Sequence, residues 1–229
     1  MTGPRPTSSV GEWLHDRSLT LTTIALFVAC AAGQVWAGWA DHNDTLSQHG
    51  RATLSLSQYV TQGHMWEALF ENWESEFLQM SAFVVLTAYL YQAGSPESRR
   101  PGVRELQDAD PRDHRDQPDA PWPVRRGGWV LRLYEYSLGG ALFLLFLVSF
   151  AGHAIGGVAA RNAEHRLHGE PETALMDYVL SSGFWFESLQ NWQSEFLSVG
   201  VMVWLAVYLR QRGSPESKPV HAPHQETGH

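Results

Sequence analysis

The chain has 229 residues, with 16 lysines and arginines against 24 acidic residues and a formal net charge of −8. This balance, without any basic stripe interleaved with aromatic residues, argues against nucleic-acid binding. The single cysteine, Cys30, rules out an intramolecular disulfide.

Long uncharged runs interrupt an otherwise polar chain. They lie between Arg17 and Asp41, between Glu76 and Glu97, between Glu135 and Arg161 (where only His153 can titrate) and between Glu195 and Arg210. A helix needs about 20 mainly apolar residues to cross a membrane. We therefore predict transmembrane helices over 19–40, 73–92, 138–160 and 192–210.

The first run has a second interpretation. Residues 1–33 could form a signal peptide, since Phe27 to Cys30 loosely resembles a lipoprotein cleavage box. However, the apolar run continues past Cys30 to Trp39, which a cleaved segment would not need. We favour a retained span.

The two halves of the chain repeat at a spacing of 119 residues. From Trp66 to Ser98 against Trp185 to Ser217, 17 of 33 positions are identical. The identities include the run Gly94 to Ser98, which recurs at 213–217, and the first helices align through Gly33 with Gly152. The sequence is therefore predicted to contain two copies of a two-helix unit.

The repeat divides the chain into segments. We predict a disordered N-terminus (1–11), repeat unit 1 (12–98), a flexible cytoplasmic linker (99–127), repeat unit 2 (128–217) and a disordered tail (218–229). The linker is rich in Arg, Asp and Pro and has few aliphatic residues, so it cannot bury much apolar surface.

Lysine and arginine counts predict the orientation. The loops between paired spans contain three of the 16, Arg51, Arg161 and Arg166, and the others lie in the N-terminus, linker and C-terminal segment. The positive-inside rule then places both termini in the cytoplasm. The predicted fold class is an all-α membrane protein, with four transmembrane helices in two parallel repeats related by a pseudo-twofold axis along the membrane normal.

Polar residues gather on one face of the second helix of each unit. The members share i, i+3 and i+4 spacing, which places them on one side of a helix: Asn72, Ser75 and Glu76 in unit 1, and Asn191, Ser194 and Glu195 in unit 2. Together with His153 they form a candidate polar intramembrane site for a proton, a cation or a small solute. The alternative is that they tie helices together through interhelical hydrogen bonds.

Other candidates have simpler interpretations. His153 aligns with Gln34 and is expected to take a hydrogen-bonded packing role. The acids Glu67, Glu71 and Glu74 are absent from unit 2 and are expected to form a solvated or interfacial face. Histidines crowd the outer loops without an established metal-site spacing (His42, His49, His64, His165 and His168). We expect caps and surface positions there, and Gly152 with Gly156 is expected to permit close helix packing.

No motif for catalysis is visible. The chain contains no Gly-x-Ser-x-Gly elbow, phosphate-binding glycine loop or paired-cysteine motif. We therefore expect neither an enzyme nor a bound cofactor or metal.

The segment Asn72 to Leu78, its echo at 191–197 and the two Gly-Ser-Pro-Glu-Ser runs carry a resemblance. So do Pro121 to Gly128 and Gly183 to Glu195. The chain resembles a family of bacterial membrane proteins catalogued only as a domain of unknown function. The resemblance implies a bacterial inner-membrane location and assigns no activity or functional residue.

Two functional hypotheses remain open. In the first, the paired Asn-Ser-Glu faces form a conduit or sensor for a proton, cation or small solute. In the second, the protein is a non-transporting accessory or scaffold subunit of a membrane complex. A membrane enzyme with a loop metal site is a more distant third. The expected partners are the lipid bilayer and either further copies of the chain or a membrane complex.

The topology can be tested by cysteine labelling. In a Cys30→Ala background, a cysteine at Ser47 should react with an impermeant reagent from outside intact cells, because that loop is predicted to face outward. A cysteine at Gln107 should react only after the membrane is opened. Labelling of Gln107 in intact cells would overturn the orientation.

Overall fold

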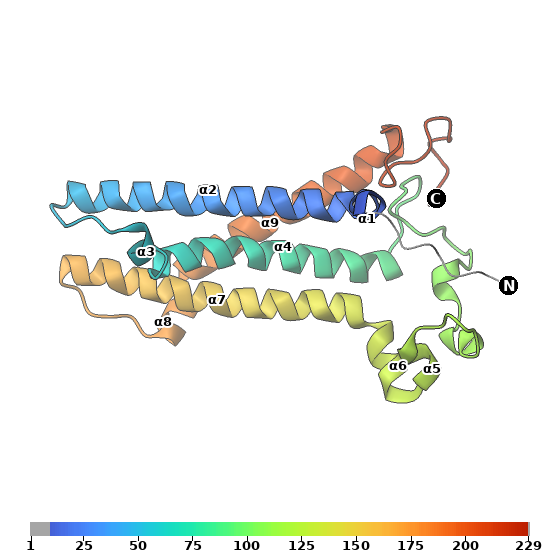
Figure 1. Cartoon of the computed structure of the whole chain (residues 1–229), viewed down its shortest axis with the longest axis horizontal. Coiled ribbons are helices and arrows are strands. Elements are labelled where there is room, and N and C mark those ends of the chain that lie inside the picture. The colour runs from blue at the N-terminus through green and yellow to red at the C-terminus, as the bar shows by residue number, and fades with distance from the viewer. Residues whose placement is uncertain (1–9, 229) are drawn as a thin grey trace. The chain divides into compact units, whose positions relative to one another are not determined.

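The computed structural model describes residues 10–228, and within this range the chain is helical, with no strand (Figure 1). The elements are α1(Val10–Asp16), α2(Ser18–Gln48), α3(Leu56–Tyr59), α4(Gly63–Tyr89), η1(Leu106–Asp108), η2(Pro111–His114), α5(Trp122–Arg126), α6(Gly128–Glu135), α7(Ser137–His168), α8(Leu175–Val179) and α9(Ser182–Tyr208). The chain forms two compact units that divide between Met65 and Trp66, a boundary that lies inside repeat unit 1. We call these compact units the first unit and the second unit. The predicted disordered N-terminus lies mostly outside the described residues.

In the first unit, the loop after α2 folds back against that helix. The Asn43 side chain accepts a hydrogen bond from the Leu54 amide at 2.7 Å and donates one to the Leu54 carbonyl at 2.9 Å. Gly38 faces the Tyr59 ring, where a Cβ atom would collide with the phenol. Tyr59 is buried, and Ser55 caps its short helix α3. The paired hydrogen bonds of Asn43 and the close contact between Gly38 and Tyr59 therefore define this hairpin.

The second unit contains the same hairpin between α7 and α8. The Asn162 side chain accepts a hydrogen bond from the Thr173 amide at 2.7 Å and donates one to the Thr173 carbonyl at 3.0 Å. Gly157 faces the Tyr178 phenol. These residues lie 119 positions after their counterparts in the first unit. The first residues of α2 and α7, and both ends of α4 and α9, also recur at this spacing. The duplicated sequence thus gives duplicated local structure.

The repeated Gly-Ser-Pro-Glu-Ser runs form one kind of turn twice. Gly94 and Gly213 both have a φ of +84°, which glycine adopts without steric cost. The last serine of each run, Ser98 or Ser217, accepts a hydrogen bond from a backbone amide six residues earlier, at 2.7 and 2.9 Å. Ring closure by the serine hydroxyl explains why this run is identical in both copies.

The linker and tail are held by polar contacts. Arg99 pairs with Asp108, and Arg100 pairs with Glu105 at 3.1 Å. In the tail, the buried Lys218 ammonium donates to three backbone carbonyls at 2.9–3.1 Å, those of Pro223, His224 and Glu226. The prediction of disorder in these segments was based on their few aliphatic residues, and it could not take such polar contacts into account. The flexibility of both segments in solution stays a prediction.

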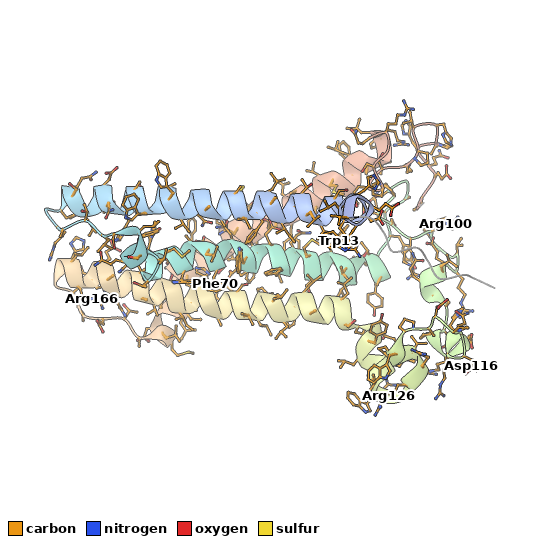
Figure 2. All side chains as sticks on the ribbon, in the orientation of Figure 1. Trp13, Phe70, Arg100, Asp116, Arg126 and Arg166 are labelled. Carbon is orange, nitrogen blue, oxygen red and sulfur yellow. The ribbon has the colours of Figure 1, made fainter. Side chains whose placement is uncertain are left out.

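Glycines of α7 allow α4 to approach closely. A Cβ atom on Gly152 would lie 2.5 Å from the Phe70 ring, and one on Gly156 would lie 2.5 Å from the Glu67 backbone nitrogen. Farther along, the Ser81 hydroxyl of α4 donates to the Gly139 carbonyl of α7 at 3.2 Å. Figure 2 shows Phe70 on α4 alongside α7. The expected small-residue packing is therefore made by α7 against α4.

Among the described residues, two helices, α2 and α7, are long and apolar enough to cross a membrane. On α7, Leu144, Val148 and Ile155 are 55–61% exposed, an apolar surface that water would not favour. Figure 2 shows Arg166 at one end of α7 and Arg100, Asp116 and Arg126 beyond the other. An uncharged helix with charged residues at its two ends suits a membrane span.

The other two predicted spans differ from the helices that the chain forms. Helix α4 ends at Tyr89 and α9 at Tyr208, before the predicted ends at 92 and 210. Their uncharged helical stretches, 77–89 and 196–208, extend about 20 Å at 1.5 Å per residue. This is shorter than the roughly 30 Å of hydrocarbon in a bilayer. Both helices are long enough only if their acidic first halves are included.

The close approach of α4 to α7 predicts a position-specific effect of adding a methyl group. Gly156→Ala should lower stability by about 1–3 kcal/mol, because the backbone of Glu67 must move. Thermal unfolding of the purified protein in detergent would measure this loss. Gly140→Ala on the same helix is the matched control, because no atom lies within 4 Å of its Cβ position. Alanine there should be neutral or stabilising by up to about 1 kcal/mol, and an equal loss at both sites would contradict the packing.

Candidate functional site

A fully buried histidine lies at the centre of the second unit. His153, on α7, has no exposed surface and stacks on the Phe184 ring with the ring centres 4.7 Å apart. Its Nδ1 atom lies 3.1 Å from Oε2 of Glu74, a carboxylate that is also fully buried. Its Nε2 atom is buried without a hydrogen-bond partner. One edge of the ring is thus fixed, and the other is free to interact.

Glu74 is held from both sides. Its Oε2 atom meets His153, and its Oε1 atom accepts a hydrogen bond of 3.0 Å from the Trp192 indole on α9. Because Glu74 is a carboxylate in this arrangement, the natural donor is the Nδ1–H of His153. A neutral ring that donates through Nδ1 has its lone pair on Nε2. Glu74 therefore links three helices and orients the histidine ring.

Two further glutamates approach the free edge of His153. Glu187 Oε2, on α9, lies 3.6 Å from Nε2, and its side chain is 40% exposed. The Tyr178 hydroxyl on α8 lies 3.1 Å from Glu67 Oε1 and 3.2 Å from Glu187 Oε2, so it can donate to either carboxylate. Burial and these two carboxylates raise the pKa of the Tyr178 phenol. Tyr178 therefore remains a hydrogen-bond donor at physiological pH.

A fourth glutamate completes the group. Glu71, on α4, accepts a hydrogen bond of 2.5 Å from the Asn191 amide. We call Glu67, Glu71, Glu74, His153, Tyr178 and Glu187 the His153 cluster. Within residues 10–228, no lysine or arginine forms an ion pair with any of its four carboxylates. The cluster therefore gathers four carboxylates around one imidazole ring, a setting that favours positive charge there.

The cluster includes a group of possible metal ligands. One ligand atom each from Glu67, His153 and Glu187 lies within 4.8 Å of the other two. In the described part of the chain, no other group of three or more His, Cys, Asp or Glu residues has this geometry. The outer-loop histidines instead make local contacts. His165 Nδ1 lies 2.7 Å from the Pro171 carbonyl, and His42 packs against Tyr59.

The residues predicted for the polar site lie in several settings. His153 is buried at the centre of the cluster, and Asn191 reaches it through Glu71. Ser75 is buried and donates to the Asn72 carbonyl at 2.8 Å, and Ser194 donates likewise to the Asn191 carbonyl. Asn72 is exposed and donates to the carbonyl of Ala68. Both asparagines thus bond within their own helix, and Asn191 bonds to a neighbouring helix as well.

The glutamates of the predicted site lie apart from the cluster. Glu76 is exposed and Glu195 is half-buried. The two carboxylates are near enough to interact electrostatically, but neither hydrogen-bonds to His153. The interpretation of Glu67, Glu71 and Glu74 as a solvated or interfacial face was wrong for Glu74, which is fully buried, and the other two are half-buried. The reason is that α7 presents glycines to this face of α4, so the carboxylates lie against another helix.

The sequence contained one signal that points to the cluster. Its histidine and glutamates occupy positions where the repeat fails: the residues 119 positions away are Gln34 for His153, Phe186 for Glu67, Gln190 for Glu71, Gln193 for Glu74 and Ala68 for Glu187. In a duplicated chain, shared residues report on shared structure. Residues acquired by one copy alone are better candidates for function.

A family model described as "Domain of unknown function (DUF6766)" matches residues 10–229. The chain belongs to this family. The match includes both copies of the repeat and every member of the His153 cluster, and it confirms the resemblance seen in the repeated segments. No curated protein and no solved structure matches the chain.

The contact between His153 and Glu74 predicts energetic coupling. His153→Gln and Glu74→Gln introduce the residues found at the aligned positions, and each should cost about 1–3 kcal/mol because a buried polar partner is lost. The double variant should depart from additivity by about 0.5–3 kcal/mol. Thermal or chemical unfolding in detergent measures all three.

Glu216→Gln supplies the control for this cycle. It follows the end of α9, whose residues from Glu187 to Tyr208 span about 30 Å along the helix axis. Its effect should add to that of His153→Gln within about 0.5 kcal/mol. Additivity in the His153 and Glu74 pair as well would show that their contact contributes nothing.

Proposed function

We propose that this protein is a multi-pass integral membrane protein of the bacterial inner membrane that binds a cation at the His153 cluster. The observation that carries the proposal is the buried histidine surrounded by four glutamates, which have no lysine or arginine partner among residues 10–228. Burying carboxylates costs several kcal/mol each unless positive charge or hydrogen bonds compensate. A bound cation supplies that charge.

The proposed membrane arrangement has four spans. The 119-residue repeat supports two parallel two-helix units, and the lysine and arginine count supports cytoplasmic termini. The spans containing α4 and α9 then include acidic first halves. A charged side chain at the membrane centre costs about 2.5–3.5 kcal/mol on insertion scales. Packing of Glu67, Glu71 and Glu74 toward α7 and α9 removes these groups from lipid.

Cation binding in a membrane protein serves either a conduit or a sensor. Small neutral solutes fit the cluster less well, because four carboxylates favour positive charge. The sequence contains no catalytic motif, which favours a role other than catalysis. We therefore propose a non-enzymatic protein that conducts or senses a cation.

An accessory or scaffold role is the second candidate. Interhelical hydrogen bonds favour it: Asn191 to Glu71, Trp192 to Glu74 and Ser81 to the Gly139 carbonyl. Such bonds hold helices together in membranes at about 0.6–2 kcal/mol each. In this interpretation the cluster holds the helices together by hydrogen bonds and needs no ligand.

Cation-dependent stability and flux separate the two candidates. The purified protein should gain thermal stability with increasing Na⁺, K⁺, Mg²⁺ or Mn²⁺, reaching about 2.7 kcal/mol at one hundred times the dissociation constant. His153→Gln and Glu187→Gln should abolish this gain. Proteoliposomes loaded with ion-sensitive dyes then distinguish a conduit, which carries flux, from a sensor, which does not.

Glu76→Gln with Glu195→Gln is the comparison variant, because these residues belonged to the site predicted from sequence. Retention of the cation effect in this variant places binding at the His153 cluster. Loss of the effect in this variant alone would place it at the symmetric glutamates instead. A wild-type protein without any cation effect or flux would leave the accessory role.

A further inference from the structure

The free edge of His153 is surrounded by oxygen ligands. Its buried Nε2 atom has no hydrogen-bond partner and lies 3.6 Å from Glu187 Oε2. Glu67 contributes the third ligand atom, and all three lie within 4.8 Å of one another. Ligands at about 2.1 Å from a tetrahedral ion are about 3.4 Å apart. Small side-chain rotations would therefore bring the three atoms onto one ion.

The surroundings prepare these ligands for a metal. A metal-binding histidine commonly donates its other ring N–H to a carboxylate, which fixes the ring and makes it a better ligand. Glu74 takes this part toward His153 Nδ1, and it is itself fixed by the Trp192 indole. The Tyr178 hydroxyl meets both ligand carboxylates.

Charge and ligand type select the class of ion. A neutral imidazole and two carboxylates carry a charge of −2, which a divalent cation neutralises and a monovalent one does not. Imidazole nitrogen suits Zn²⁺ and Fe²⁺ better than Ca²⁺ or Mg²⁺, which prefer all-oxygen sites. The mixed nitrogen and oxygen set thus favours a divalent transition metal. Three protein ligands leave a coordination position open, and the 40% exposure of Glu187 gives the site an approach from outside.

We propose that Glu67, His153 and Glu187 bind a divalent transition-metal ion, with Glu74 and Tyr178 as supporting residues. This inference rests on the proposed cation-binding function and names the class of ion that the cluster takes. It also gives Tyr178 a purpose: its hydroxyl keeps the two carboxylates together when no ion is bound. The repeat-related positions cannot form a second such site, since Phe186, Gln34 and Ala68 align with Glu67, His153 and Glu187.

The test uses the full chain in detergent, stripped with a chelator and dialysed against Zn²⁺. Elemental analysis should find one ion per chain beyond weak surface binding. Co²⁺ in place of Zn²⁺ should give a visible absorption spectrum that reports nitrogen and oxygen ligands. His153→Gln and Glu187→Gln should weaken binding by at least about tenfold, as should Glu74→Gln, which changes only the support of the histidine.

His165→Gln is the matched control, because it makes the same substitution on the same helix and should leave the affinity unchanged. If His153→Gln does not fold, Glu187→Gln remains decisive because its side chain is partly exposed. No Zn²⁺ binding, or binding that survives both ligand variants, overturns the metal site. Flux of another cation without Zn²⁺ binding would overturn only this inference, whereas Zn²⁺ binding without flux would exclude only the conduit.

Discussion

Burial of the Glu74 carboxylate against His153 is the constraint on which the second unit depends. Removing a carboxylate from water costs several kcal/mol even after relaxation, and a single hydrogen bond does not recover this. Glu74 therefore has a donor on each oxygen, His153 from α7 and Trp192 from α9. These two contacts position three helices relative to one another. Phe184 covers the ring of His153 and excludes water from it.

That contact is possible only because α7 presents glycines to α4. With any side chain at Gly152 or Gly156, Phe70 and the backbone of Glu67 would be displaced. In the same helix Gly157 admits the Tyr178 phenol, which brings α8 and its hydroxyl to the ligand carboxylates. The glycines of α7 thus allow polar side chains on neighbouring helices to approach one another. They allow four helices to bring ionisable groups to one place.

Duplication and divergence have separate consequences in this chain. The asparagine hydrogen bonds to the loop, the glycine–tyrosine contacts and the Gly-Ser-Pro-Glu-Ser turns occur in both copies. Each of them stabilises the local conformation of the backbone. The charged cluster occurs where the copies differ. Because the charge occurs once while the local structure occurs twice, we place the proposed cation at the His153 cluster and not at the symmetric polar faces. Ser75 and Ser194 make the same bond within their helices, which fits this view.

The helices, the repeat and the family could be predicted from the amino-acid sequence, because periodicity, identity at a fixed spacing and motif runs are local properties. It identified α2 and α7 as membrane-crossing candidates from their uncharged length, and it placed His153 among the site residues. It did not identify the partners of His153. Glu67, Glu71 and Glu74 would be expected to face solvent on an isolated helix, and Glu187 has no glutamate at the aligned position of the other repeat unit. Which face of α4 meets α7 became clear from the folded chain alone. It depends on how the glycines of α7 and the aromatic side chains fit across helices, and on the cost of leaving a carboxylate buried without a partner.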